Sequence, residues 1–256
     1  MNRREESLRV HLGKIITVLL LAALPAVAQQ QPTATPSSQD QSKAEDEKNT
    51  DPRVEVSPRS GTSNDRLFYT LPNFLTLENT GQLTPLTTGQ KFKVVARGTF
   101  DYVEFPWYAA LAGISQAQNS EPGYGQGAAG YSKRYGAAFA DGTIENFMVG
   151  AVFPSLLRQD PRFYQLGTGT FWHRTGYAIS RIFVTRTDSG HKQFNFSEFL
   201  GSALAAGIST YSYHPRADRT LPNTASVWGT QVEYDTLIIV VKEFWPDIRR
   251  KISHKR

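Results

Sequence analysis

Five arginines between positions 158 and 186 are the residues whose type and spacing most clearly suggest chemistry. They alternate with aromatic side chains, and they are Arg158, Arg162, Arg174, Arg181 and Arg186. A guanidinium binds a phosphate or carboxylate through two parallel hydrogen bonds, and aromatic rings favour a membrane interface. The pattern predicts a binding site for an anionic group. The alternative is a solvated helix face whose arginines pair with neighbouring carboxylates.

A hydroxyl and an imidazole lie close together in the string Asp188-Ser189-Gly190-His191. A serine nucleophile needs a histidine held by a carboxylate, together with an oxyanion hole, and adjacency along the chain supplies neither. An envelope hydrolase that uses this loop therefore stays an alternative, and the sequence favours a protein of non-enzymatic binding or structural type.

Other motifs for cofactors and metals lack their required context. The glycines of Gly125-Gln126-Gly127-Ala128-Ala129-Gly130 match a dinucleotide fingerprint, but no hydrophobic strand precedes them. The chain has no cysteine, and none of His173, His191 and His214 has a second ligand at metal-binding spacing. We therefore predict no metal, no cofactor and no assigned catalytic residue.

The N-terminal 65 residues read as export and tether segments. A basic start, an apolar run over 15–24 and the small-x-small string Ala26-Val27-Ala28 predict a cleaved signal peptide over 1–28. Residues 29–65 contain hardly any apolar side chains, so we expect a disordered linker. The predicted location is the periplasm or the outer-membrane surface.

The remaining segment, 66–256, is basic, with 20 Lys and Arg against 14 Asp and Glu. For an exported protein this charge favours an anionic lipid or envelope polymer as partner and not nucleic acid. The basic end at 247–252 could make peripheral membrane contact, or it could simply complement a helix dipole.

The spacing of apolar residues in 66–256 predicts an all-α fold, a compact bundle of about five to six helices. An apolar arm over 67–77 precedes the helices, which are expected over 88–103, from Pro106, over 128–158 with a kink at Pro154, over 171–184, over 195–211, and over 225–245 with a basic end from Pro246. Gly201, Ala205 and Ser209 recur every fourth residue, which favours close helix–helix packing. An outer-membrane β-barrel is a second alternative, suggested by export and by the many aromatic residues.

Several strings in this domain resemble a family of exported, uncharacterised proteins of environmental Gram-negative bacteria. They are Gly125-Gln126-Gly127 through Tyr135-Gly136, Gln159-Asp160-Pro161-Arg162-Phe163, the stretch from Ser180 to Gly190, and Lys242-Glu243-Phe244-Trp245-Pro246-Asp247. The resemblance spans roughly Leu67 to Lys251. It implies export and one folded unit, and it transfers no activity and no catalytic residue.

Overall fold

The computed structural model describes residues 62–63, 65–68, 70–77 and 84–253. The predicted signal peptide and nearly all of the predicted linker lie outside these residues. At the linker's end, the Ser63 amide already donates to the carbonyl of Phe74, and the Asp65 carboxylate pairs with Arg249. The folded part therefore begins slightly before position 66.

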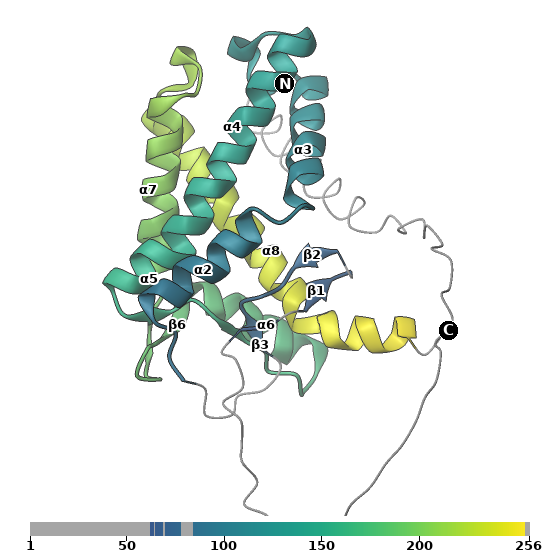
Figure 1. The fold of residues 1–256 in the computed structure, drawn as a ribbon, viewed down its shortest axis with the longest axis vertical. Coiled ribbons are helices and arrows are strands. Elements are labelled where there is room, and N and C mark those ends of the chain that lie inside the picture. The colour runs from purple at the N-terminus through teal and green to yellow at the C-terminus, as the bar shows by residue number, and fades with distance from the viewer. Residues whose placement is uncertain (1–61, 64, 69, 78–83, 254–256) are drawn as a thin grey trace, which may run out of the picture. The chain divides into compact units, whose positions relative to one another are not determined.

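Helices dominate the described residues, as expected for an all-α fold. The α-helices are α2 (Thr88–Thr99), α3 (Glu104–Gln118), α4 (Gly127–Phe147), α5 (Phe153–Leu156), α6 (Phe171–Phe183), α7 (Phe196–Ser212) and α8 (Leu221–Ser253). Helix α4 packs between α3 and α7, and α8 packs against α7 and α6 behind them (Figure 1). Within the described residues, no helix is both long enough and apolar enough to cross a bilayer.

Side-chain caps fix the starts of several helices. Thr87 and Gln90 form a capping box, in which each side chain bonds the backbone amide of the other residue. Asn195 caps α7 by accepting from the amide of Glu198, and Thr170 caps α6 in the same way through His173. These local signals explain why the helix starts near 88, 171 and 196 agree with the sequence pattern.

Helix α4 does not run on to Arg158 as one α-helix. It passes into a π-helical turn over Met148–Val152 and then into α5, where Pro154 occupies the first turn. Just opposite, a Cβ added to Gly201 of α7 would lie 3.1 Å from the Met148 carbonyl carbon. The missing side chain therefore lets α7 and the π-turn approach closely.

Short strands, which the helical periodicity did not predict, link the segments between the helices. β1 (Arg66–Leu67) pairs with β2 (Leu71–Pro72), and β3 (Thr76–Leu77) runs parallel to β5 (Phe163–Tyr164). A three-stranded antiparallel sheet has the order β4 (Gln159–Asp160), β6 (Val184–Thr187) and β7 (Lys192–Phe194). The expected apolar arm is thus anchored by β3 to the segment that follows α5.

The predicted last helix was too short at both ends, since α8 continues through Pro246 to Ser253. A proline inside a helix removes one hydrogen bond and kinks the axis. The final turns of α8 do run in a new direction (Figure 1). Arg174 of α6 bonds Glu243 before the proline and Asp247 after it, which holds both sides of the kink in place.

Candidate ligand cavity

A cavity of about 290 Å³ lies where several helices and the short strands meet. Its charged lining residues come from segments far apart in the sequence: Glu104, Glu145, Asp160, Arg162, Arg181, Arg186, Glu198, Asp235 and Lys242. A water molecule takes up roughly 30 Å³ of liquid, so the space suits about ten waters or one small molecule.

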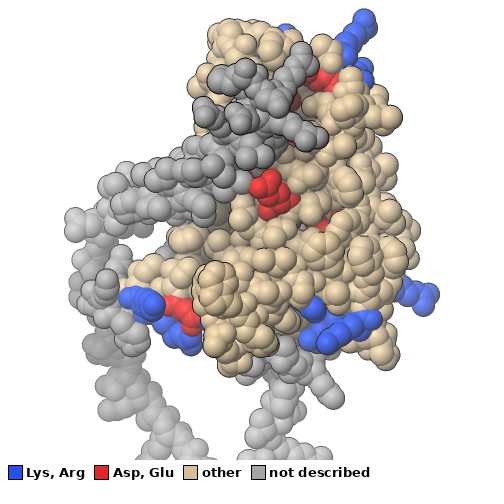
Figure 2. Space-filling model, turned by 180° about the vertical axis from the view of Figure 1, so that it is seen from behind, with Lys and Arg blue, Asp and Glu red and all other residues tan. Residues whose placement is uncertain are grey.

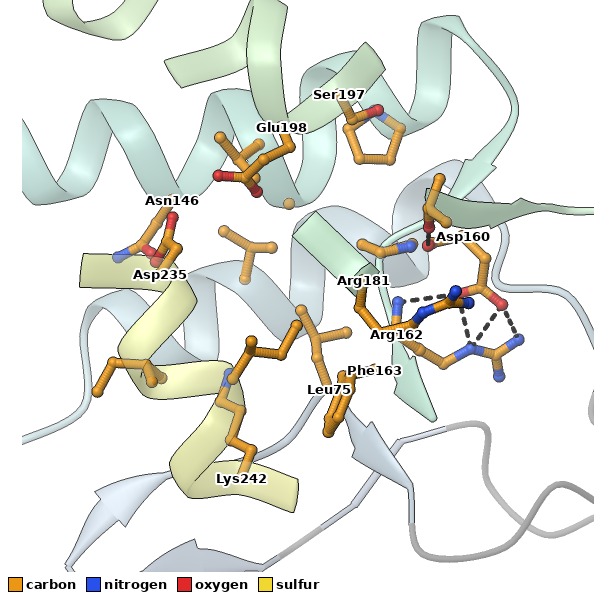
Figure 3. A pocket seen from close by; sticks show the side chains of 18 of the residues that line it. Leu75, Asn146, Asp160, Arg162, Phe163, Arg181, Ser197, Glu198, Asp235 and Lys242 are labelled. Atoms are coloured by element: carbon orange, nitrogen blue, oxygen red, sulfur yellow. Dashed lines mark hydrogen bonds and ion pairs between the residues drawn. The ribbon is translucent and has the colours of Figure 1, made fainter. Parts of the chain in front are cut away.

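Three helices bring carboxyl groups together on one side of this cavity. Glu145 lies near the end of α4, Glu198 in the first turn of α7, and Asp235 in the middle of α8. Glu198 and Asp235 are close enough that each carboxyl group affects the pKa of the other. Figure 3 shows these two side chains on the same side as Asn146.

Burial makes ionisation of these carboxyl groups unfavourable. It raises the pKa of Glu145 to about 9, with the neighbouring Asp235 and Asp141 adding to the shift. The pKa of Glu198 is also raised, first by burial and then by Asp235 and Glu145. At neutral pH, this side of the cavity therefore holds protonated carboxyl groups in place of a set of negative charges.

Several buried oxygen atoms of the cavity lining have no hydrogen-bond partner. They are Oδ1 of Asn73, Oγ1 of Thr99, Oε1 of Glu145 and Oε1 of Glu198. Asn73 is 2% exposed and Glu198 is 6% exposed, so bulk solvent does not satisfy them. Because buried polar groups are rarely left unpaired, this lining is arranged for a polar occupant.

Cationic side chains line the same cavity from three other positions. The Arg181 guanidinium lies 4.8 Å from the centre of the Tyr177 ring and donates to the Ser180 hydroxyl. Arg186 of β6 lies 4.3 Å from the centre of the Tyr164 ring. In the described part of the chain, neither arginine pairs with a carboxylate, and neither does Lys242 of α8.

Arg162 is a structural member of the lining. Its Nη2 lies 2.7 Å from Oδ2 of Asp160, its Nε bonds both carboxylate oxygens, and the Tyr164 hydroxyl donates to the same carboxylate. Both charges are buried and mutually satisfied. Arg162 therefore shapes the wall between β4 and β5 and does not offer a free cation.

The five arginines predicted as one site are thus divided. Arg162, Arg181 and Arg186 line the cavity, whereas Arg174 bonds Glu243 and Asp247 at the contact of α6 with α8. Arg158 is exposed, with a positive φ of 52°, and does not line the cavity. The chain turns back at Arg158 to form β4, so even close neighbours in sequence point into different surroundings.

The sequence prediction missed Glu145, Glu198, Asp235 and Lys242. A signal for them was present, since each is charged within a largely apolar helical stretch, as Glu198 is in Phe196-Ser197-Glu198-Phe199-Leu200. Charged residues are seldom buried without a reason. Only the packing of α4, α7 and α8 brings the four together.

The loop with Ser189 and His191 lies elsewhere, in the exposed turn between β6 and β7. Ser189 Oγ is 3.1 Å from His191 Nδ1, but the Asp188 carboxylate is bound by the buried ammonium of Lys91 at 2.8 Å. The carboxylate next to the motif therefore does not orient the imidazole. Among the described residues, no group of three or more His, Asp or Glu side chains is arranged to hold a metal ion.

The chain matches no known family model, no curated protein and no solved structure.

Proposed function

We propose that this protein is a non-enzymatic binding protein of the cell envelope whose cavity takes a small anionic ligand. The observation that carries the proposal is the set of three cationic side chains, Arg181, Arg186 and Lys242, which line one cavity without a carboxylate partner in the described residues. They come from α6, β6 and α8, so the packed fold orients them.

The energetics favour an anion in this position. Burial lowers the pKa of Lys242 because its charged form is poorly solvated, and the nearby carboxyl groups of Asp235 and Glu198 offset this only in part. An anion beside it restores the charged form and accepts hydrogen bonds from the two guanidinium groups. Stacking on Tyr177 and Tyr164 orients those guanidinium groups before the ligand arrives.

The envelope location rests on the sequence. A predicted signal peptide and polar linker precede the folded part, whose basic balance suits an anionic surrounding. The resemblance to exported proteins agrees with this location and adds no activity.

Isothermal titration of the purified mature protein with inorganic phosphate and with propionate tests the binding function. The double variant Arg181→Gln/Arg186→Gln should weaken binding by about tenfold or more, which corresponds to ~1.4 kcal/mol. Arg158→Gln is the matched control, because Arg158 is exposed and lies outside the cavity. Equal losses in both variants, or no binding of either anion, would contradict the proposal.

A second candidate function, peripheral attachment to an anionic membrane, is favoured by a patch at the end of α8. Trp172 is 79% exposed, Phe171 and Ile252 are also exposed, and Arg250 and Lys251 lie beside them. Seen from behind, the molecule carries few charges in its middle and most of its Lys and Arg near its lower edge (Figure 2). Exposed aromatic rings next to basic side chains suit a lipid interface.

Flotation with vesicles of phosphatidylglycerol and phosphatidylcholine tests this attachment. The protein should float with the anionic vesicles at low salt, and Trp172→Ala with Lys251→Glu should abolish this. Exposed Leu221→Ala serves as the control substitution. Recovery of the unaltered protein entirely in the lipid-free fraction would remove the candidate.

The hydrolase alternative has less support. Lys91 holds the carboxylate of Asp188, so a hydrolytic role for His191 would require another residue to orient the imidazole. If the His191→Ala variant hydrolyses ester probes as fast as the unaltered protein, the hydrolase alternative is wrong.

A further inference from the structure

The two sides of the cavity differ in chemical character. Figure 3 shows Glu198, Asp235 and Asn146 on one side and Arg162 with Asp160 on the other, with Arg181 beside Arg162. Arg186 lines the same space. A ligand that fills the cavity therefore meets carboxyl groups at one end and guanidinium groups at the other.

The unpartnered atoms of the lining specify what the carboxyl side lacks. Oε1 of Glu198, Oε1 of Glu145 and Oδ1 of Asn73 are all oxygen acceptors, and all are buried without a donor. Asn73 follows β2 and lies outside the carboxyl cluster, so its unpartnered oxygen is a separate observation that the lining lacks a hydrogen-bond donor. The missing partner on this side is a hydrogen-bond donor.

We propose that the carboxyl groups of Glu145, Glu198 and Asp235 form a subsite for a primary ammonium, so that the ligand is a small zwitterion bearing an amine and a carboxylate or phosphate. This inference rests on the proposed function, because the anionic end of the ligand lies at Arg181 and Arg186. The ammonium subsite goes beyond the proposed function, and it specifies the class of ligand.

An ammonium suits this subsite because it carries a positive charge and donates hydrogen bonds. It carries three N–H donors, and the three carboxyl groups come from three different helices. Lys242 cannot fill the role, since within the described residues its ammonium makes no ion pair or hydrogen bond with these groups, although it feels their charge. When the ligand binds, a carboxyl group that contacts the ammonium releases its proton to solvent, and the positive charge of the ammonium takes its place.

The size of the cavity limits the ligand to a small molecule. About 290 Å³ is at the lower end of the volumes of ligand pockets, which favours a molecule such as a free amino acid or an aminoalkyl phosphate. Both present an ammonium a few bonds away from an anionic group. Two pairs of probes distinguish a ligand with a carboxylate from a ligand with a phosphate.

The test compares probes that differ only in the amine. Alanine is paired with propionate, and phosphoethanolamine is paired with ethyl phosphate, each titrated calorimetrically into the mature protein. The expected result is that at least one amine-bearing probe binds about tenfold or more tightly than its deaminated partner. The pair that shows the larger preference identifies carboxylate or phosphate as the anionic group.

Glu198→Gln is the decisive variant, because glutamine has the shape of the protonated acid and should keep the fold. It should abolish the preference for the amine, whereas Arg158→Gln should retain it. In the unaltered protein, the preference should also grow as the pH rises, because the carboxyl groups must release their proton. Other groups titrate in the same lining: Glu104, Glu145, Asp235 and Lys242. Their effect on binding of the anionic end is the same for both probes of a pair, so it cancels in the ratio of the two affinities.

The outcomes separate this inference from the proposed function. If propionate or ethyl phosphate binds and depends on Arg181 and Arg186, but the amine gives no advantage, the ammonium subsite is wrong and the anion site stands. An amine preference that survives in Glu198→Gln also overturns the subsite. If none of the four probes binds, both proposals fail.

Discussion

Two buried glutamates of this protein show how differently one fold can treat the same side chain. Glu243 of α8 is 0% exposed, and its oxygens accept from the amides of Leu166 and Gly167 and from Nε of Arg174. Glu198 of α7 is 6% exposed, borders the cavity, and leaves Oε1 without a donor.

The difference separates a carboxylate whose oxygens receive hydrogen bonds from a carboxyl group that keeps an unpartnered oxygen. The Glu243 carboxylate receives a full set of donors, so its charge is stabilised and it joins α6 to α8. The pKa of Glu198 is raised well above its ordinary value, because burial removes solvent and Asp235 supplies a competing negative charge. A buried carboxyl group without a donor destabilises the protein while the cavity is empty. A hydrogen-bond donor that enters the cavity removes this destabilisation.

The largest expected effect on stability is at the cluster of Arg174, Glu243 and Asp247. Arg174→Met keeps the volume of the side chain but leaves Glu243 as a buried charge without its cation. Breaking a buried ion pair from one side costs about 3–5 kcal/mol. Urea unfolding followed by circular dichroism measures this loss, and Arg158→Met should change stability by less than about 0.5 kcal/mol. Equal stabilities for the two variants would refute the structural role of Arg174.

The same substitution at the two glutamates should act in opposite directions. Glu243→Gln removes a charge that receives strong hydrogen bonds and should cost about 1.5–3 kcal/mol. Glu198→Gln removes an acid that is poorly solvated when charged, and it should stabilise the protein at pH 8 by about 1 kcal/mol or more. Thermal unfolding of both variants in one buffer gives the comparison, and destabilisation by both would show that Glu198 is also fully satisfied.

A further expected effect concerns the dependence of stability on pH. The pKa of Glu145 in the folded protein is about 9, above that of an unfolded glutamate, so the folded state holds its proton more tightly. Its contribution to stability is complete below about pH 4.5 and is lost as the pH rises towards 9. Glu145→Gln should therefore flatten the fall in melting temperature between pH 5 and pH 9, and curves of equal slope for the variant and the unaltered protein would argue against a neutral Glu145.

Local signals in the sequence were enough to locate most of the helices. Thr87 with Gln90 and Asn195 with Glu198 cap helices where the spacing indicated. The pairing of β3 with β5 was missed because its partners lie more than 80 residues apart, for which the local pattern has no signal. The pairs β1 with β2 and β6 with β7 are local, but strands of two to four residues are too short to show an alternating pattern.

The candidate site was predictable only in part. Arg181 and Arg186 do line the cavity, and their types indicated an anion. Arg162 pairs with Asp160, a near neighbour in sequence, as the alternative of neighbouring ion pairs allowed. Arg174 pairs with Glu243, 69 residues away, and a one-dimensional pattern cannot show such pairing. The carboxyl groups of Glu145, Glu198 and Asp235 meet through helix packing alone.

The most direct measurement is native mass spectrometry of the full protein purified from the cells that produce it. Our account predicts one added small molecule per chain, carrying both an amine and an anionic group, and its loss from the Arg181→Gln/Arg186→Gln variant. A chain that carries no small molecule at any ligand concentration, or an adduct that the double variant retains unchanged, would contradict the assignment of this cavity as a binding site.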